Sequence, residues 1–139
     1  MIKIDFADKT VKINSEYYAS LVKESRALRR KPRGSPLWFL QDNAPIHKSQ
    51  MTMRTIQDSN FHLVEHPPYS PDLAPSDFWL FRHLKKELRG QHFESPTCVR
   101  RAVENFLTSK NPDFYSNAFS ELLTRWKKCV DRNGSYVEK

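Results

Sequence analysis

The feature that most constrains the fold is a short, uninterrupted apolar run, Leu37–Leu40, followed by one polar residue and then by Asp42. Such a run is typical of a β-strand that is buried on both faces, within a sheet covered by helices. Residues 61–65 form a second strand candidate, and residues 2–6 alternate apolar and polar side chains as a half-exposed strand does. Helical patterns lie between and after these segments, so the chain predicts an α/β fold.

The helical segments have recognisable beginnings and ends. One helix is expected to start at Asn14 or Ser15, either of which can cap it, and to reach about residue 30; a weaker one covers residues 46–58. Three helices then close the chain: residues 76–89, a second capped by Ser95, and a third beginning near Asn111. The last helix carries an apolar stripe predicted to be buried, made of Tyr115, Phe119, Leu122, Leu123, Trp126, Cys129 and Val130. Because the connections are short, residues 1–139 are expected to form one domain.

The charge balance favours a polyanionic partner. The formal net charge of the 139 residues is +7, and an excess of this size points first to nucleic acid. Each basic cluster taken alone is better explained as a solvated helix face. The clusters are Arg26, Arg29, Arg30, Lys31 and Arg33; Lys85, Lys86 and Arg89; Arg100 and Arg101; and Arg125, Lys127 and Lys128. No stretch has the roughly 18 apolar residues of a membrane span, so no membrane partner is expected.

Two aspartates occupy positions where a metal site can form. Asp42 follows the buried strand, and ligands of open α/β sheets bind outside the carboxyl ends of strands. Asp77 begins a helix after a proline-rich loop, where a carboxylate is stabilised by the helix N-terminus. Taken individually, Asp42 is better explained as a turn residue and Asp77 as a helix cap. As a pair on rigid elements, their oxygens can bind Mg²⁺, and two such ions stabilise an in-line phosphoryl displacement.

The residues around these aspartates form two distinctive blocks. Residues 42–47 are Asp-Asn-Ala-Pro-Ile-His, and residues 66–77 are His-Pro-Pro-Tyr-Ser-Pro-Asp-Leu-Ala-Pro-Ser-Asp. Both blocks resemble signature segments of the mariner-type transposases of the Tc1/mariner superfamily. The 34 residues between Asp42 and Asp77 also resemble that family's spacing between its second and third catalytic aspartates. The resemblance covers nearly the whole chain, because residues 13–18 and 125–136 are similar to the family as well.

The resemblance implies an RNase H-like (DDE/D transposase) fold and an endonuclease that uses Mg²⁺ or Mn²⁺. Such enzymes of transposable elements cut DNA at transposon ends and join those ends to target DNA, which is DNA transposition and integration, and they work in the nucleus. By position, Asp42 resembles the second metal ligand and Asp77 the third. A homodimer, or pairing with a full-length transposase, is implied as well, and the loop of residues 67–75 is expected to orient Asp77.

Other residues are expected near the site or the DNA. Asn43 and His47 would lie beside the metal ligands, with His47 shaping the site or contacting DNA; a purely structural histidine is the alternative. Tyr69 and Trp79 can stack on bases or pack in a core. The candidates for DNA binding or for shaping the site are Asn43, His47, Tyr69, Arg29, Arg30, Lys31, Lys85 and Lys86.

The family's first catalytic aspartate has no counterpart in this sequence. Only 41 residues precede Asp42, and Asp5 lies in a context that resembles the family's third strand, so neither Asp5 nor Asp8 is assigned a catalytic role. The chain is therefore expected to be an N-terminally truncated domain that lacks the first two strands and the helix-turn-helix region. Residues 1–12 are then expected to be poorly anchored.

Three functional hypotheses remain open on the sequence. The first is a metal-dependent transposase or endonuclease domain. The second is a remnant or domesticated module that binds DNA or protein without catalysis. The third is a segment of a longer transposase that supplies the missing carboxylate upstream.

Overall fold

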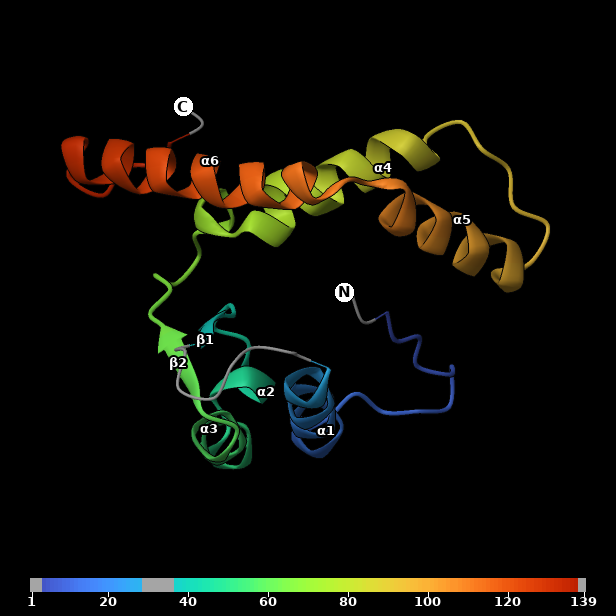
Figure 1. Ribbon diagram of the computed structural model, residues 1–139, viewed down its shortest axis with the longest axis horizontal. Helices are drawn as coiled ribbons and strands as arrows, with labels where there is room; N and C mark the ends of the chain where they lie inside the picture. Colours follow the sequence, from blue (N-terminus) through green and yellow to red (C-terminus); the bar gives the residue numbers. More distant parts are fainter. Residues whose placement is uncertain (1–3, 29–36, 138–139) are drawn as a thin grey trace. The chain divides into compact units, whose positions relative to one another are not determined.

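The computed structural model describes residues 4–28 and 37–137. Three of the residues predicted to contact DNA, Arg29, Arg30 and Lys31, lie outside these ranges. The chain divides into two compact units, Met1–Tyr69 and Ser70–Lys139. Figure 1 labels the helices and strands of both units. Among the described residues, no helix is long and apolar enough to cross a membrane.

The first unit is built on a parallel pair of strands. Strand β1 (Leu37–Leu40) pairs with β2 (Phe61–Val64), with Leu37 opposite Phe61 and Leu40 opposite Val64. Two parallel neighbours need a crossover connection, and helices α2 (Pro45–Lys48) and α3 (Gln50–Asp58) provide it. Helix α1 (Ser15–Ala27) packs against α3 (Figure 1). The pairing confirms both strands predicted here.

The core of this unit takes one buried side chain from each principal element. Val22 of α1, Leu37 of β1, Ile56 of α3 and Phe61 of β2 form one cluster, and each is at most 9% exposed. Asn14 caps α1, as predicted, by accepting a hydrogen bond from the backbone N–H of Tyr17. Removal of this apolar surface from water is the main term that stabilises the unit.

The second unit is helical. It contains a 3₁₀ turn (Pro71–Leu73), a π-helical segment (Ser76–Phe81) and helices α4 (Arg82–Leu88), α5 (Pro96–Ser109) and α6 (Pro112–Asp131). The predicted caps of α5 and α6 are confirmed: Ser95 and Asn111 each accept a backbone N–H three residues ahead. Its buried apolar residues are Leu73, Ala74, Phe78, Phe106, Leu107, Ala118 and Leu122.

The structure differs from four local predictions. Residues 4–6 are not strand, because no neighbouring strand among the described residues accepts their backbone hydrogen bonds. The helix predicted over residues 46–58 is broken at Ser49, whose extended backbone caps α3. The helix over residues 76–89 begins as a π-helix. The stripe on α6 is only partly buried, since Phe119, Leu123 and Val130 are exposed.

Ile56 offers a direct test of the core, because its side chain is only 1% exposed. Ile56→Ala is expected to reduce the free energy of unfolding by about 3 kcal/mol, and Ile56→Val by about 1 kcal/mol, because each leaves a cavity of different size. Urea denaturation followed by circular dichroism measures both. Met51→Ala on the same helix, at a half-exposed position, is the control and should change stability much less.

Candidate active site

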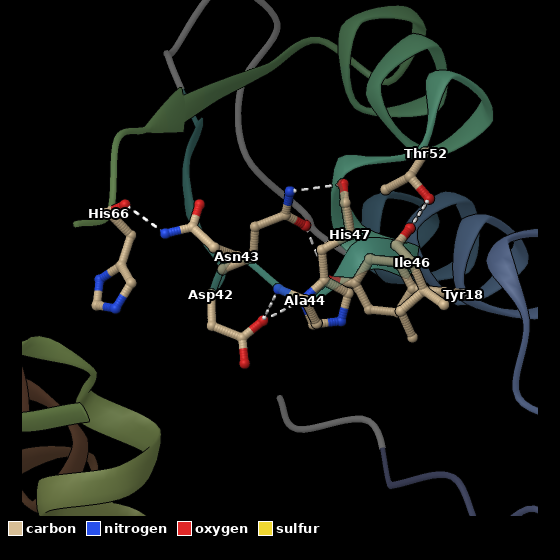
Figure 2. Close-up of polar contacts among 9 residues, drawn as sticks. Tyr18, Asp42, Asn43, Ala44, Ile46, His47, Thr52 and His66 are labelled. Atoms are coloured by element: carbon tan, nitrogen blue, oxygen red, sulfur yellow. Dashed lines mark hydrogen bonds and ion pairs between the residues drawn. The ribbon is translucent and has the colours of Figure 1, made fainter. Parts of the chain in front are cut away.

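The Asp42 carboxylate is held just beyond the end of β1. Its Oδ1 accepts the backbone N–H of Ala44 at 3.0 Å and lies 2.5 Å from Nδ1 of His47 (Figure 2). A carboxylate only accepts, so the proton of this bond belongs to His47 Nδ1. Both contacts fall on one oxygen, and the side chain is 56% exposed. Among the described residues Oδ2 has no hydrogen bond, so it faces solvent as an available ligand.

These contacts keep Asp42 ionised. The backbone N–H of Ala44 is the largest cause that lowers the pKa of the Asp42 carboxyl below its ordinary value. Partial burial opposes the shift, while the hydrogen bond and the charge of His47, and the charge of His66, add to it. Donors that bond the charged form of a carboxyl favour that form, so an anionic oxygen is present at neutral pH.

Behind His47 lies a closed set of polar and aromatic contacts. The His47 ring lies against the ring of Tyr18, with centroids 4.1 Å apart. Tyr18 donates its hydroxyl to Gln41 Oε1 at 3.0 Å, and Gln41 Nε2 donates to the carbonyl of His47 at 3.1 Å. Burial, followed by the charge of Asp42, raises the pKa of Tyr18 to about 12, so this hydroxyl stays a donor. The set holds the imidazole in the orientation that meets Asp42.

Sequence reasoning missed Tyr18 and Gln41 as members of this site. Tyr18 belongs to α1, and nothing in its local sequence indicates a polar partner for its hydroxyl. Gln41 stands next to Asp42, and a polar residue at the end of a buried strand was the available signal. Their partners are 23 and 6 residues away, so only the folded unit brings them together.

Asn43 joins the ends of the two strands. Its side-chain Nδ2 donates to the backbone carbonyl of His66 at 2.7 Å, across 23 residues of chain (Figure 2). Thr52, which is fully buried, donates its hydroxyl to the carbonyl of Ile46 at 2.7 Å and so ties α2 to α3. The two sequence blocks that carry the family resemblance therefore meet at the carboxyl edge of the sheet, because His66 begins the second block.

Asp77 belongs to the second unit and lies in the π-helical segment. Its backbone N–H donates to the carbonyl of Ala74 at 2.9 Å, which fixes the start of this segment. The side chain is exposed and, within the described ranges, makes no hydrogen bond or ion pair. Single π-helical turns are rare and frequently occur at functional sites.

The loop before Asp77 is anchored by a buried arginine. Arg125 of α6 is 9% exposed and donates Nη1 to the backbone carbonyl of Asp72 at 3.1 Å. Its Nε donates to Glu121 at 3.0 Å, and its guanidinium lies 4.2 Å from the ring centroid of Phe78. Asp72 is itself buried and accepts the backbone N–H of Val137. The interpretation of Arg125 as a solvated surface cation was therefore wrong, because these partners replace water around its charge.

The remaining candidates lie at the surface. Tyr69 is 89% exposed, and its backbone φ of 52° is in the left-handed region that bulky residues rarely adopt. Lys85 and Lys86 are exposed on α4. Trp79 packs against His83 and Phe114, with ring centroids 4.8 and 5.7 Å away, which favours core packing over base stacking.

Each of the two aspartates, taken separately, offers donor atoms that a hard divalent cation prefers. Asp42 offers an ionised carboxylate with one open oxygen, and Asp77 offers an exposed carboxylate, both of the ligand type that Mg²⁺ and Mn²⁺ take. Among the described residues of either unit taken alone, no three His, Cys, Asp or Glu side chains are grouped to hold an ion.

Comparison with known proteins identifies the family of the chain. Residues 3–99 match the family described as DDE superfamily endonuclease. The human histone-lysine N-methyltransferase SETMAR is 35% identical to the chain over 144 residues, which is 99% of this chain and 21% of that protein. The Mariner Mos1 transposase of Drosophila mauritiana is 36% identical over 129 residues, 89% of this chain and 37% of the relative. The chain thus spans about a fifth to two fifths of these relatives.

The fold comparison agrees. Solved structures of the Mos1 catalytic domain with raltegravir and Mn and of the Mos1 mariner paired end complex with Mn both have a TM-score of 0.83. The match to the catalytic domain covers 91% of this chain and 66% of the solved chain, at 34% sequence identity. The match to the paired end complex covers 91% of this chain and 38% of the solved chain, at 35% sequence identity. The structure is therefore an RNase H-like fold of the DDE class. The chain belongs to the DDE superfamily endonuclease family, and its predicted resemblance to mariner-type transposases is confirmed.

The contacts of Asp42 predict a pH dependence. Its folded pKa lies below the unfolded value of about 3.9, so its bonds contribute stability above that pH. This contribution is lost as the pH falls through the folded pKa. His47→Ala is expected to raise the Asp42 pKa only in part, because the bond from the Ala44 N–H remains. Carboxyl ¹³C chemical shifts titrated by NMR measure both values, and an ordinary aspartate pKa in the parent protein would contradict the geometry.

Arg125→Ala is expected to destabilise the second unit by about 2 kcal/mol, because it removes a buried hydrogen-bond donor and the contact with Phe78. Urea denaturation measures the loss. Lys127→Ala on the same helix removes an exposed cation and should stay within about 0.5 kcal/mol of the parent. Equal effects of the two substitutions would show that Arg125 does not anchor the loop.

Proposed function

We propose that this chain is part of a mariner-type transposase catalytic domain, in which Asp42 and Asp77 are metal ligands of a centre that cleaves and joins DNA. The observation that carries the proposal is the Asp42 carboxylate, held at the end of a buried strand by Ala44 and His47 with one oxygen open. The family match over residues 3–99 supports DNA as the substrate. The nucleus is proposed as the place of action because that is where such DNA lies.

The chemistry follows from the phosphodiester. The phosphodiester is already anionic, so it repels an attacking hydroxide, and a catalyst must neutralise charge on the attacking and leaving oxygens. Mg²⁺ or Mn²⁺, when bound, would supply that neutralisation for an in-line displacement at phosphorus. In this chain Asp42 and Asp77 would supply oxygen ligands. His47 would keep Asp42 oriented and ionised, and Asn43 would hold the end of β1 against the segment that begins at His66.

The proposal includes a second protein copy as partner. The Mos1 structure named above is a paired end complex, which supports assembly of more than one chain on transposon ends. Tyr69 is proposed to face such a partner or the DNA, because its ring is exposed on a loop with left-handed backbone.

A second function is a binding module without catalysis. The observation that favours it is the similarity over 99% of this chain to SETMAR, which is named for a different chemistry, histone-lysine methylation. A domain retained beside another enzyme can serve by binding DNA or protein alone.

Plasmid nicking separates the two functions. Purified protein, supercoiled plasmid and Mn²⁺ are expected to yield nicked circles. Asp42→Asn and Asp77→Asn should each lower the rate by more than about 100-fold, since even outer partners of metal sites are worth 10- to 100-fold. Asp58→Asn, at an exposed aspartate of α3, is the matched control and should leave the rate unchanged.

The outcomes assign the function directly. Nicking that disappears in both variants but persists in the control supports the catalytic proposal. Nicking that survives Asp42→Asn would point to a contaminating nuclease and overturn the assignment of Asp42. DNA binding without nicking in any protein would favour the non-catalytic module.

A further inference from the structure

The second unit contains a groove outside the residues discussed for catalysis. The groove has a volume of about 720 Å³. Residues 78–89, from the π-helical segment, α4 and the residue after it, line one side, and residues of helix α6 line the other. Two aromatic residues, one histidine, five cations and one carboxylate line the groove. These residues are Phe78, Trp79, Arg82, His83, Lys85, Lys86, Arg89, Glu121 and Arg125.

Four of the cations in the groove remain available to a ligand. Arg125 is committed to Glu121 and to the carbonyl of Asp72, so this pair contributes no net charge. Arg82, Lys85, Lys86 and Arg89 are exposed, and none of them forms an ion pair or hydrogen bond within residues 4–28 and 37–137. Like charges held together without counterions repel one another, and a polyanion relieves that repulsion.

The spacing of these cations is regular. Positions 82, 85, 86 and 89 are separated by three, one and three residues, which places them on one helical face. They span about 10 Å along the axis, with roughly 5 Å between turns. A row of fixed positive charges at this spacing suits a row of phosphates on a nucleic acid strand.

The aromatic wall of the groove indicates which form of DNA fits. Binding of single strands relies on exposed aromatic faces on which bases stack. Trp79 instead packs against His83 and Phe114, and Phe78 is buried beneath the guanidinium of Arg125. The groove therefore offers charge without a stacking platform, and paired bases can remain in their duplex.

We propose that this groove binds the phosphodiester backbone of duplex DNA through Arg82, Lys85, Lys86 and Arg89, without reading base sequence. The inference rests on the proposed function for its choice of DNA as partner, but it uses neither Asp42 nor Asp77. The groove supplies sequence-independent affinity, and any sequence specificity must come from other contacts.

The salt dependence of binding tests the proposal. Binding to two duplexes of unrelated sequence is measured by fluorescence anisotropy at several salt concentrations, in EDTA and with Asp42→Asn present in every protein. The double variant Lys85→Ala/Lys86→Ala is expected to reduce the slope of log K against log[salt] by about 2, because each phosphate contact contributes about 0.9. The change should be equal for both duplexes.

Matched controls isolate the groove from net charge. Lys127→Ala/Lys128→Ala removes the same charge from exposed positions of α6 that do not line the groove, and it should change the slope by much less. Lys85→Arg/Lys86→Arg keeps the charge and should keep the slope.

Three results would overturn the proposal: equal slope changes in the two alanine pairs, a change confined to one duplex, or stronger groove-dependent binding to polyglutamate than to DNA. If the protein does not nick plasmid but the salt slope depends on the groove lysines, only the catalytic proposal is rejected. A normal nicking rate with an unchanged slope would reject only the groove.

Discussion

The parallel pairing of β1 with β2 is the constraint on which the rest of the first unit depends. Parallel neighbours run in one direction, so both carboxyl ends open at the same edge, and the chain must cross over through helices to achieve this. That edge receives Asp42 from one strand and His66 from the other, and the 2.7 Å bond from Asn43 closes the gap between them. A slip of one residue in this register would turn Leu37 and Phe61 out of the core and separate the two sequence blocks. The geometry around Asp42 and Asn43 thus depends on the burial of four apolar side chains.

The second level of organisation is local and polar. Asp42 accepts hydrogen bonds from the backbone N–H of Ala44, two residues ahead, and from the imidazole of His47, five residues ahead. Its orientation therefore depends mainly on neighbours in the sequence. The imidazole is in turn held by Tyr18 and Gln41, which bring α1 and the end of β1 into the same set. A carboxylate held in a fixed orientation by its neighbours loses less conformational freedom when it takes part in binding.

Prediction from the sequence succeeded where local chemistry decides the structure. Asn14, Ser95 and Asn111 could be predicted as caps because each satisfies an N–H only three residues away, and β1 because an apolar run of four has few alternatives. It failed where distant partners decide. The charge of Arg125 predicts exposure, but contacts with Asp72, 53 residues away, and with Phe78 bury it. The π-helical start at Ser76 has no signal in periodicity, and the alternation at residues 4–6 cannot produce a strand without a neighbour.

The two proposed sites differ in how their charged side chains are surrounded: the carboxylate of the first is hydrogen-bonded, and the cations of the second have no partner among the described residues. Asp42, the proposed metal ligand, has hydrogen-bond donors on one carboxylate oxygen and solvent at the other, so it stays both ionised and ordered. A cation that serves a polyanion must stay unpaired, and Lys85 and Lys86 satisfy this by standing exposed on α4 without carboxylate partners among the described residues. Arg125 is the opposite case. Because it is buried and paired with Glu121 and with the carbonyl of Asp72, it stabilises the loop before Asp77 and does not add to the basic surface. The net charge of +7 is therefore a poor guide to affinity by itself, because what matters is which cations are left without a partner.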